Sequence, residues 1–217
     1  MILFLVACKQ PEPDGYLPIS IDVADAFDHL VVTTVTGDIV IEHTDETFLS
    51  GQLIVIDDQD DYSLAIVAGV LTLAASCVNG EAGCSGAFFL SVPAGPSIDV
   101  ITTAGDLTLD TVHDHVVTHS STTGDVYGYD LGRSITVTAE TTAGRHDVQF
   151  KHEPKALTLT AQTGNVEATV PAGLYAVEVI SGGTDTVTGV TVDASGKLIR
   201  LSSQEGDVTL TGVFEEY

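Results

Sequence analysis

The chain has 217 residues and a formal net charge of −24, because 31 acidic side chains stand against only 7 basic ones. Proteins that bind DNA or RNA neutralise phosphates with lysine and arginine, so this balance argues against a nucleic-acid partner, and anionic membrane surfaces would repel the same chain. A hydrophobic fraction of 44% with 18% charged residues excludes general disorder. The many Thr and Val residues favour β-strands, since β-branched side chains suit a pleated surface.

The chain opens with an apolar run, MILFLVAC, that ends in Leu5-Val6-Ala7-Cys8. This ending resembles the lipobox of bacterial lipoproteins, in which a small residue precedes a cysteine that becomes lipid-modified. The run has no basic residue and is shorter than a complete signal peptide, so we interpret residues 1–8 as a partial lipoprotein signal whose true start lies upstream. The resemblance implies export, lipid attachment at Cys8 and anchoring in the bacterial cell envelope, on its periplasmic or surface side. The alternative is a buried N-terminal strand. A transmembrane helix is excluded for this run, because it is far shorter than the roughly 20 residues that a span requires.

Residues 9–28 are expected to form a Pro-rich tether, because KQPEPDGYLP combines polar residues with prolines. A repeat domain is expected over residues 29–217. Within that domain, IDDQDDYS at 56–63 predicts an exposed loop tip. The apolar run LAIVAGVLTLAA at 64–75 predicts strands that are wholly buried at one end of the domain.

Two further cysteines flank a predicted turn. Cys77 and Cys84 enclose VNGEAG, in which Asn79-Gly80 is a hairpin signal, and the six intervening residues can fold back to bring the two Cβ atoms to disulfide distance. An exported protein would keep such a pair oxidised. A zinc site at the same place lacks two further ligands. The sequence therefore predicts a Cys77–Cys84 disulfide.

A motif of Thr, a small residue, Gly and a polar residue recurs about every 20 residues. Its glycines fall at positions 105, 124, 144, 164 and 183, in steps of 19, 20, 20 and 19 residues. A second marker, VPAG, occurs at 92–95 and at 170–173, and it gives the same total of 78 residues over four periods. Weaker copies at Gly37 and Gly206 open and close the array. The expected turn glycines are Gly37, Gly105, Gly124, Gly144, Gly164, Gly183 and Gly206.

Between motifs the chain reads as two short runs of alternating apolar and polar residues, such as DLTLD and HVVTHSS after Gly105. Such runs bury one face and leave the other in water. A single pair of short strands is only marginally stable, so the repeats must stack to share a core. Glycine suits the corner of each coil, where the backbone turns with positive φ or passes close to its neighbours. We therefore predict an all-β fold, a single β-solenoid of mostly parallel strands, with an antiparallel β-sandwich as the alternative.

The motif also resembles that of a known family. Proteins of the "putative adhesin" family of unknown function (the DUF4097 type) repeat T-x-G-D-V-x-V. This chain carries the corresponding pairs Gly37-Asp38, Gly105-Asp106, Gly124-Asp125, Gly164-Asn165 and Gly206-Asp207. The pair Gly144-Arg145 differs, because it has arginine where the family motif has aspartate. The resemblance, clearest over residues 92–211, implies a β-solenoid in an envelope setting and supplies no catalytic residues.

Two sets of polar residues are candidates for metal binding. His113, His115 and His119 share strand parity in HDHVVTH and would line one solvent-facing side, where imidazoles can bind a transition metal. Asp106 and Asp125 occupy equivalent corners, but calcium needs six to eight oxygen ligands and the next corners do not continue the carboxylates. We interpret these histidines and aspartates as surface residues, and we predict no metal site and no cofactor.

The sequence carries no Gly-x-Ser-x-Gly elbow, phosphate loop or metalloprotease helix motif. We therefore predict a non-enzymatic envelope lipoprotein with an adhesin-like scaffold or surface-interaction role. The alternative is a binding module for an envelope glycan or protein, with an aromatic patch around Tyr127, Tyr129 and Phe150. A second alternative is a polysaccharide-active β-helix enzyme, which is disfavoured because the chain has no Trp and few cations.

Overall fold

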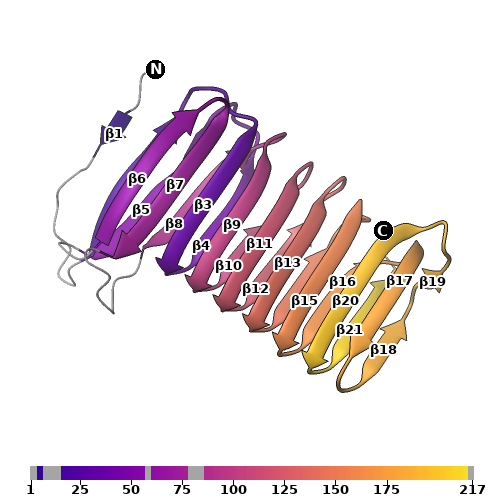
Figure 1. Ribbon diagram of the computed structural model, residues 1–217. Helices are drawn as coiled ribbons and strands as arrows, with labels where there is room; N and C mark the ends of the chain where they lie inside the picture. Colours follow the sequence, from indigo (N-terminus) through magenta and orange to yellow (C-terminus); the bar gives the residue numbers. More distant parts are fainter. Residues whose placement is uncertain (1–3, 7–15, 57–59, 78–85, 215–217) are drawn as a thin grey trace.

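The structure, a computed structural model, describes residues 4–6, 16–56, 60–77 and 86–214. Two β-sheets face each other along the length of the molecule and enclose one core (Figure 1). Sheet A has the spatial order β1 (Phe4–Val6), β2 (Tyr16–Val23), β5 (Leu49–Ile56), β8 (Ala87–Pro93), β4 (Ile39–Thr44), β10 (Leu107–Asp110), β12 (Val126–Leu131), β14 (His146–Phe150), β16 (Val166–Pro171), β21 (Val208–Val213) and β18 (Asp185–Thr188). Sheet B has the order β19 (Thr191–Val192), β17 (Leu174–Ser181), β20 (Lys197–Glu205), β15 (Ala156–Thr163), β13 (Thr136–Ala143), β11 (Val116–Thr123), β9 (Ser97–Ala104), β3 (His29–Thr36), β7 (Val70–Cys77) and β6 (Asp60–Val67). Within the described ranges, no helix is long and apolar enough to cross a bilayer.

Neighbouring strands run parallel in both sheets, except for the pairs β1–β2, β2–β5, β5–β8 and β6–β7. Each regular coil consists of a strand of sheet B, a glycine corner, a strand of sheet A, and a second corner that returns the chain to sheet B. Successive coils stack in register, as β9, β11, β13 and β15 do in sheet B. This arrangement confirms the predicted all-β solenoid, and the parallel pairing rules out the antiparallel sandwich.

The core consists of rows of side chains that stack from coil to coil. Along sheet A, the register places Leu107 beside Val126, and Val166 beside Val208, and all four side chains are fully buried. Burial of a Val or Leu side chain contributes about 1.5–3 kcal/mol relative to exposure. Because every coil repeats the same inward positions, the coils stabilise one another and no single coil has a core of its own.

Spatial order departs from chain order at both ends of the solenoid. The coil formed by β3 and β4 lies between β7–β8 and β9–β10. At the other end, β20 pairs with both β15 and β17, so the last coil of the chain inserts before the coil of β17 and β18. The expectation that Gly206 closes the array was therefore wrong. The inserted coil buries Ile199 and Leu201 completely, whereas Val177 of the displaced coil is only partly buried.

Residues 16–23 form a strand, so the prediction of a tether over residues 9–28 was wrong for this part of the segment. β2 pairs antiparallel with β5 along its whole length. Its inward side chains Ile19, Ile21 and Val23 are buried. The segment ISIDV at 19–23 alternates apolar and polar residues, which is the pattern of a half-buried strand despite the prolines before it.

The apolar run at 64–75 belongs to the β6–β7 hairpin, and only half of it is buried as predicted. β7 buries its inward side chains, Leu71, Leu73 and Ala75. β6 is the edge strand of sheet B, and its Val67 is 70% exposed. Ala68 and Gly69 form the turn with φ values of 52° and 81°, and this two-residue conformation matches the twist of a hairpin.

Candidate functional site

The glycine corners form a column along one side of the solenoid. Its spatial order is Gly86, Gly37, Gly105, Gly124, Gly144, Gly164, Gly206 and Gly183. A Cβ added at Gly124 would lie 2.1 Å from the carbonyl oxygen of Gly105, and one at Gly144 would lie 2.0 Å from that of Gly124. No real Cβ comes so close to an oxygen, so the stacking of corners itself requires glycine. Gly86 was not among the predicted turn glycines, because SGA at 85–87 lacks the Thr of the motif.

The residues after these glycines form a second column, in which a side-chain oxygen accepts the backbone N–H of the next corner. The bonds are Asp106 N–H to Asp38 Oδ1 (3.0 Å), Asp125 N–H to Asp106 Oδ1 (2.7 Å), Arg145 N–H to Asp125 Oδ1 (2.7 Å), Asp207 N–H to Asn165 Oδ1 (3.0 Å) and Thr184 N–H to Asp207 Oδ1 (2.8 Å). Arginine has no acceptor to offer, so Arg145 interrupts this column. The acidic residues of the motif therefore join successive coils through hydrogen bonds.

Arg145 organises the carboxylates beside its corner. Its Nη2 donates to Asp147 Oδ2 at 2.8 Å and to Glu167 Oε2 at 3.0 Å, so one cation joins strands β14 and β16 on the outward face of sheet A. This cation offsets repulsion between two carboxylates that the register places side by side.

Tyr127 and Tyr129 lie next to this network on the outward face of β12. Their rings are parallel within 3°, with centroids 6.3 Å apart. The Tyr127 hydroxyl donates to Asp125 Oδ2 at 2.8 Å, and this bond raises the pKa of Tyr127 to about 12. Phe150, which we had expected beside them, is 4% exposed and belongs to the core. The predicted aromatic patch therefore contains only the two tyrosines.

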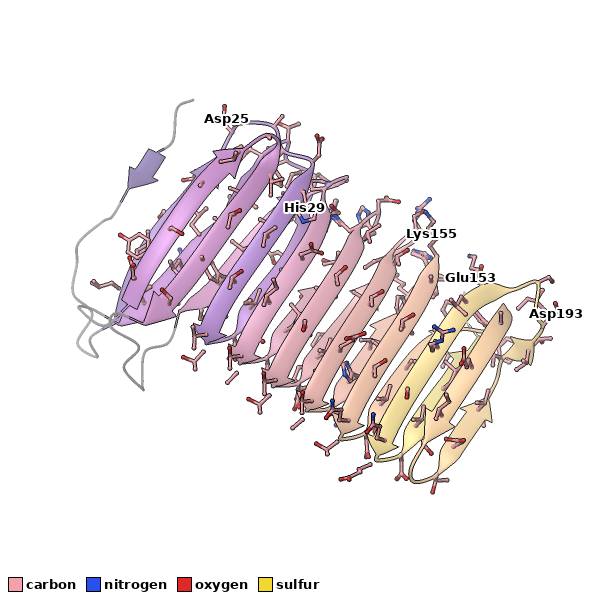
Figure 2. The ribbon with its side chains drawn as sticks, viewed as in Figure 1. Asp25, His29, Glu153, Lys155 and Asp193 are labelled. Carbon is pink, nitrogen blue, oxygen red and sulfur yellow. The ribbon has the colours of Figure 1, made fainter. Side chains whose placement is uncertain are left out.

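The outward face of sheet B is broad, and no other strand of the described part of the chain covers it (Figure 2). On β11, β13 and β15 the outward side chains are Val116, Thr118, Ser120, Thr122, Thr136, Thr138, Glu140, Thr142, Ala156, Thr158, Thr160 and Gln162, all exposed or half-buried. Eight of them carry a hydroxyl and only Glu140 is charged. We call these twelve residues the hydroxyl face. Its low charge contrasts with a chain whose net charge is −24.

The three histidines predicted to line one solvent-facing side do not do so, because two of them are buried, and that prediction was wrong. His119 faces inward on β11 beside Val117 and is 1% exposed. His115 lies in the corner before β11 and is 2% exposed, whereas the His113 side chain in the same corner is 33% exposed. His115 and His119 do share one side of the chain, as predicted, but that side faces the core and not the solvent. The polar character of histidine suggested the solvent side, which Val116 and Thr118 occupy instead.

His119 has a second buried histidine, His146, within electrostatic reach. In the neighbouring coils the equivalent positions hold aliphatic residues, Val100 for His119 and Val126 for His146. Burial lowers the pKa of each imidazole to about 4, so both rings are neutral near pH 7. The His146 Nε2 lies 3.2 Å from the carbonyl oxygen of Thr160. No local pattern predicts this pair, because its members lie 27 positions apart in the chain.

Cys8 and Cys84 lie outside the described residues, and Cys77 is the last residue of β7. Lipid attachment at Cys8 and a Cys77–Cys84 disulfide therefore stay predictions. The predicted loop tip over 56–63 was wrong at both of its ends, because Ile56 ends β5 and residues 60–63 begin β6. Residues 57–59 lie outside the described residues.

No family model matches the sequence, and no curated protein matches it. Solved structures do share the fold. A "putative cell adhesion protein" from Clostridium sporogenes is 9% identical with a TM-score of 0.51, and the match covers 90% of this chain and 100% of that one. A "putative adhesin" from Bacteroides fragilis is 14% identical with a TM-score of 0.50, and the match covers 94% of this chain and 100% of that one. At these identities the likeness shows a common β-solenoid fold.

Proposed function

We propose that this protein is an exported, non-enzymatic β-solenoid that adheres to surface polymers through its hydroxyl face. The observation that carries the proposal is the broad, uncovered and nearly uncharged area on an otherwise acidic chain. The description of the two solved structures as adhesion proteins agrees with this role.

The hydroxyl face has the chemistry to contact a polymer that is rich in hydroxyl groups, such as a neutral envelope polysaccharide. Each Thr or Ser hydroxyl can donate one hydrogen bond and accept others. Parallel strands repeat these groups about every 4.8 Å across the sheet, so the face is a regular array held by a rigid backbone. Each contact is weak by itself, and many contacts along an extended array add up to adhesion.

A charge substitution on each sheet tests which face adheres. Thr138→Glu with Thr158→Glu places two carboxylates on adjacent strands of the hydroxyl face. Thr169→Glu with Thr211→Glu does the same on the outward face of sheet A, and all four threonines are half-buried. We expect the first pair to weaken retention on polysaccharide fractions from the native envelope by at least about tenfold, which corresponds to about 1.4 kcal/mol, and the second pair to leave it unchanged. Equal retention by both double variants would refute the hydroxyl face.

A second candidate is a more specific binding module at Tyr127 and Tyr129. Parallel aromatic rings beside the Arg145 network offer apolar faces next to hydrogen-bonding groups, a combination found in sites for small polar ligands. Tyr129→Ala removes the more exposed ring and should abolish binding of a defined envelope glycan or protein. The hydroxyl-face variant described above should bind that ligand normally if the tyrosines form the site.

Envelope attachment and the absence of catalysis are further parts of the proposal. We expect metabolic labelling with a palmitate analogue to modify the protein at Cys8 and to fail in a Cys8→Ser variant. Peptide mapping of unreduced protein should find Cys77 joined to Cys84. Turnover of a polysaccharide by the purified protein would contradict the non-enzymatic role and support the β-helix enzyme.

A further inference from the structure

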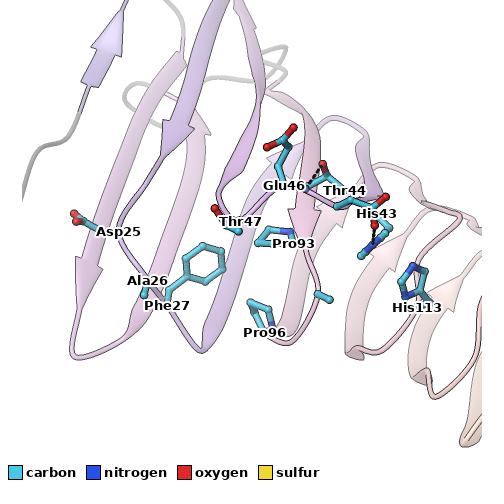
Figure 3. A pocket seen from close by; sticks show the side chains of 12 residues that line it. Asp25, Ala26, Phe27, His43, Thr44, Glu46, Thr47, Pro93, Pro96 and His113 are labelled. Carbon is cyan, nitrogen blue, oxygen red and sulfur yellow. Dashed lines mark hydrogen bonds and ion pairs between the residues drawn. The ribbon is translucent and has the colours of Figure 1, made fainter.

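Three histidines from distant parts of the sequence meet at the corner that lies across the coil from the glycine column. His43 lies near the end of β4, and His113 and His115 lie in the corner between β10 and β11. The ring centroids of His43 and His113 are 3.7 Å apart, and those of His43 and His115 are 6.2 Å apart. His43 and His113 line a hollow of about 430 Å³, and Figure 3 shows their side chains among those that line it.

Each of the three rings has one nitrogen next to an oxygen acceptor. The His115 Nδ1 lies 2.8 Å from the carbonyl oxygen of Pro96, and since a carbonyl can only accept, Nδ1 carries the proton. His113 Nδ1 lies 3.0 Å from Asp114 Oδ2, and His43 Nε2 lies 3.5 Å from Asp45 Oδ1. A neutral imidazole that donates from one nitrogen bears a lone pair on the other. The free lone pairs of His113 and His115 are then on Nε2, and a His43 ring whose Nε2 carries its proton towards Asp45 has its lone pair on Nδ1.

Two of these lone pairs are buried without a partner. The His43 side chain is 10% exposed and His115 is 2% exposed. Among the described residues, neither His43 Nδ1 nor His115 Nε2 has a hydrogen-bond partner. Buried polar atoms in folded proteins are normally satisfied, so two orphaned nitrogens in one cluster point to a missing ligand.

We propose that His43, His113 and His115 bind a divalent transition-metal ion, with Zn²⁺ as the best-suited species. Imidazole nitrogens suit Zn²⁺, and three histidines with a fourth open position form a common tetrahedral set. Carbonyl and carboxylate oxygens that hold the opposite ring nitrogen are the usual second partners of metal-bound histidines. The carboxylates of Asp25, Asp45 and Glu46 line the same hollow and would attract a cation.

The His113 ring must rotate to complete the site. In the described side-chain positions, no three potential ligands of the chain are grouped to hold an ion. His113 stacks on His43 at an interplanar angle of 43°, and metal–nitrogen bonds of about 2.0–2.1 Å need the rings to spread around the ion. The His113 side chain is 33% exposed, so it can turn without disturbing the core, and on turning its Nδ1 exchanges Asp114 for water. The bound ion would join β4 to the β10–β11 corner.

Zinc titration of the full-length, chelator-stripped protein tests the site. We expect one Zn²⁺ per chain by calorimetry, and Co²⁺ in its place should give the absorption of a tetrahedral complex. His113→Gln should weaken Zn²⁺ binding at least about tenfold. His29→Gln is the matched control, because His29 also has a 33% exposed side chain paired with an aspartate. Both variants keep all three cysteines, so thiol binding contributes equally to both.

Three results would overturn the proposal. The first is no zinc binding by the wild type at concentrations up to about 1 mM, where a specific site would be filled. The second is a His113→Gln variant that binds as tightly as the wild type. The third is an equal loss in the His29→Gln control. Because His113 is partly exposed in a corner, its substitution is expected to leave the fold intact.

Discussion

The central coils and the two ends of the solenoid are built from similar strands but are assembled differently. From β9 to β16, each coil stacks on the one before it in the sequence, at steps of 19 or 20 residues. At both ends a coil is inserted out of chain order. The repeat therefore specifies how one corner fits on another, and it does not specify which coil must come next.

The two ends also differ from each other. At the N-terminal end, sheets A and B finish in antiparallel strands, β1, β2 and β5 on one side and β6 on the other. These antiparallel strands end the parallel stacking of coils. At the C-terminal end the inward-facing Val177 and Val179 are only partly buried, and Val192 is 60% exposed. The middle of the molecule is consequently its most tightly enclosed part.

The largest expected effect is at the central glycine column. Gly124→Ala should destabilise the protein by at least about 4 kcal/mol, or prevent folding, because the added Cβ meets the Gly105 carbonyl. Gly95→Ala is the control, since Gly95 also has a positive φ, 114°, but open space around it. Its cost should be about 1–3 kcal/mol, from backbone strain alone. Urea unfolding of both variants measures the difference, and equal losses would show that stacking is not what requires glycine.

The buried histidines should make the central coils sensitive to acid. A histidine that titrates near 6.5 when unfolded and near 4 when folded costs nothing above pH 6.5, and it lowers stability as pH falls from 6.5 towards 4. His146→Val should remove about 2 kcal/mol of the stability lost between pH 7.5 and pH 5. His119→Val should act in the same direction. Denaturation curves at the two pH values test this, and an unchanged pH dependence in both variants would contradict it.

One substitution made at two places compares the middle with the C-terminal end. Val137 lies in β13 and is 1% exposed, whereas Val179 lies in β17 and is only partly buried. We expect Val137→Ala to cost about 2 kcal/mol and Val179→Ala less than about 1 kcal/mol, because a cavity forms only where the site is enclosed. Thermal unfolding of the two variants gives the comparison. A larger loss at Val179 would mean that the C-terminal end is enclosed in solution.

The smallest expected effect concerns the column of corner carboxylates. Asp125→Ala removes the acceptors for both the Arg145 N–H and the Tyr127 hydroxyl, and it should cost about 1 kcal/mol because both bonds lie at the surface. Asp125→Asn should cost less, because an amide oxygen can accept the same bond, as Asn165 does for the Asp207 N–H. Chemical denaturation distinguishes the two variants. If both lose the same stability, the negative charge of Asp125 matters more than its hydrogen bond.

The solenoid and its glycine corners could be read from the sequence because they rest on local chemistry. Strand alternation fixes which side chains share a face, and a corner such as Gly124 shows itself by residue type and by regular spacing. The prediction of which side chains face solvent was wrong where polar residues are buried. His115 and His119 are polar, yet their parity with Val117 placed them in the core.

By itself, the sequence determined the all-β class, the coil of about 20 residues and the positions of the central corners, since these follow from the alternation and the period of the chain. Only the tertiary structure decided that β20 lies between β15 and β17, that Gly86 joins the glycine column, and that His43 meets His113. Those outcomes depend on contacts between residues far apart in the chain. The edge strand of a parallel sheet can pair with any coil whose register matches. Because the repeat makes several coils equivalent in this respect, the apolar surface that each would bury decides which coil stacks at each end.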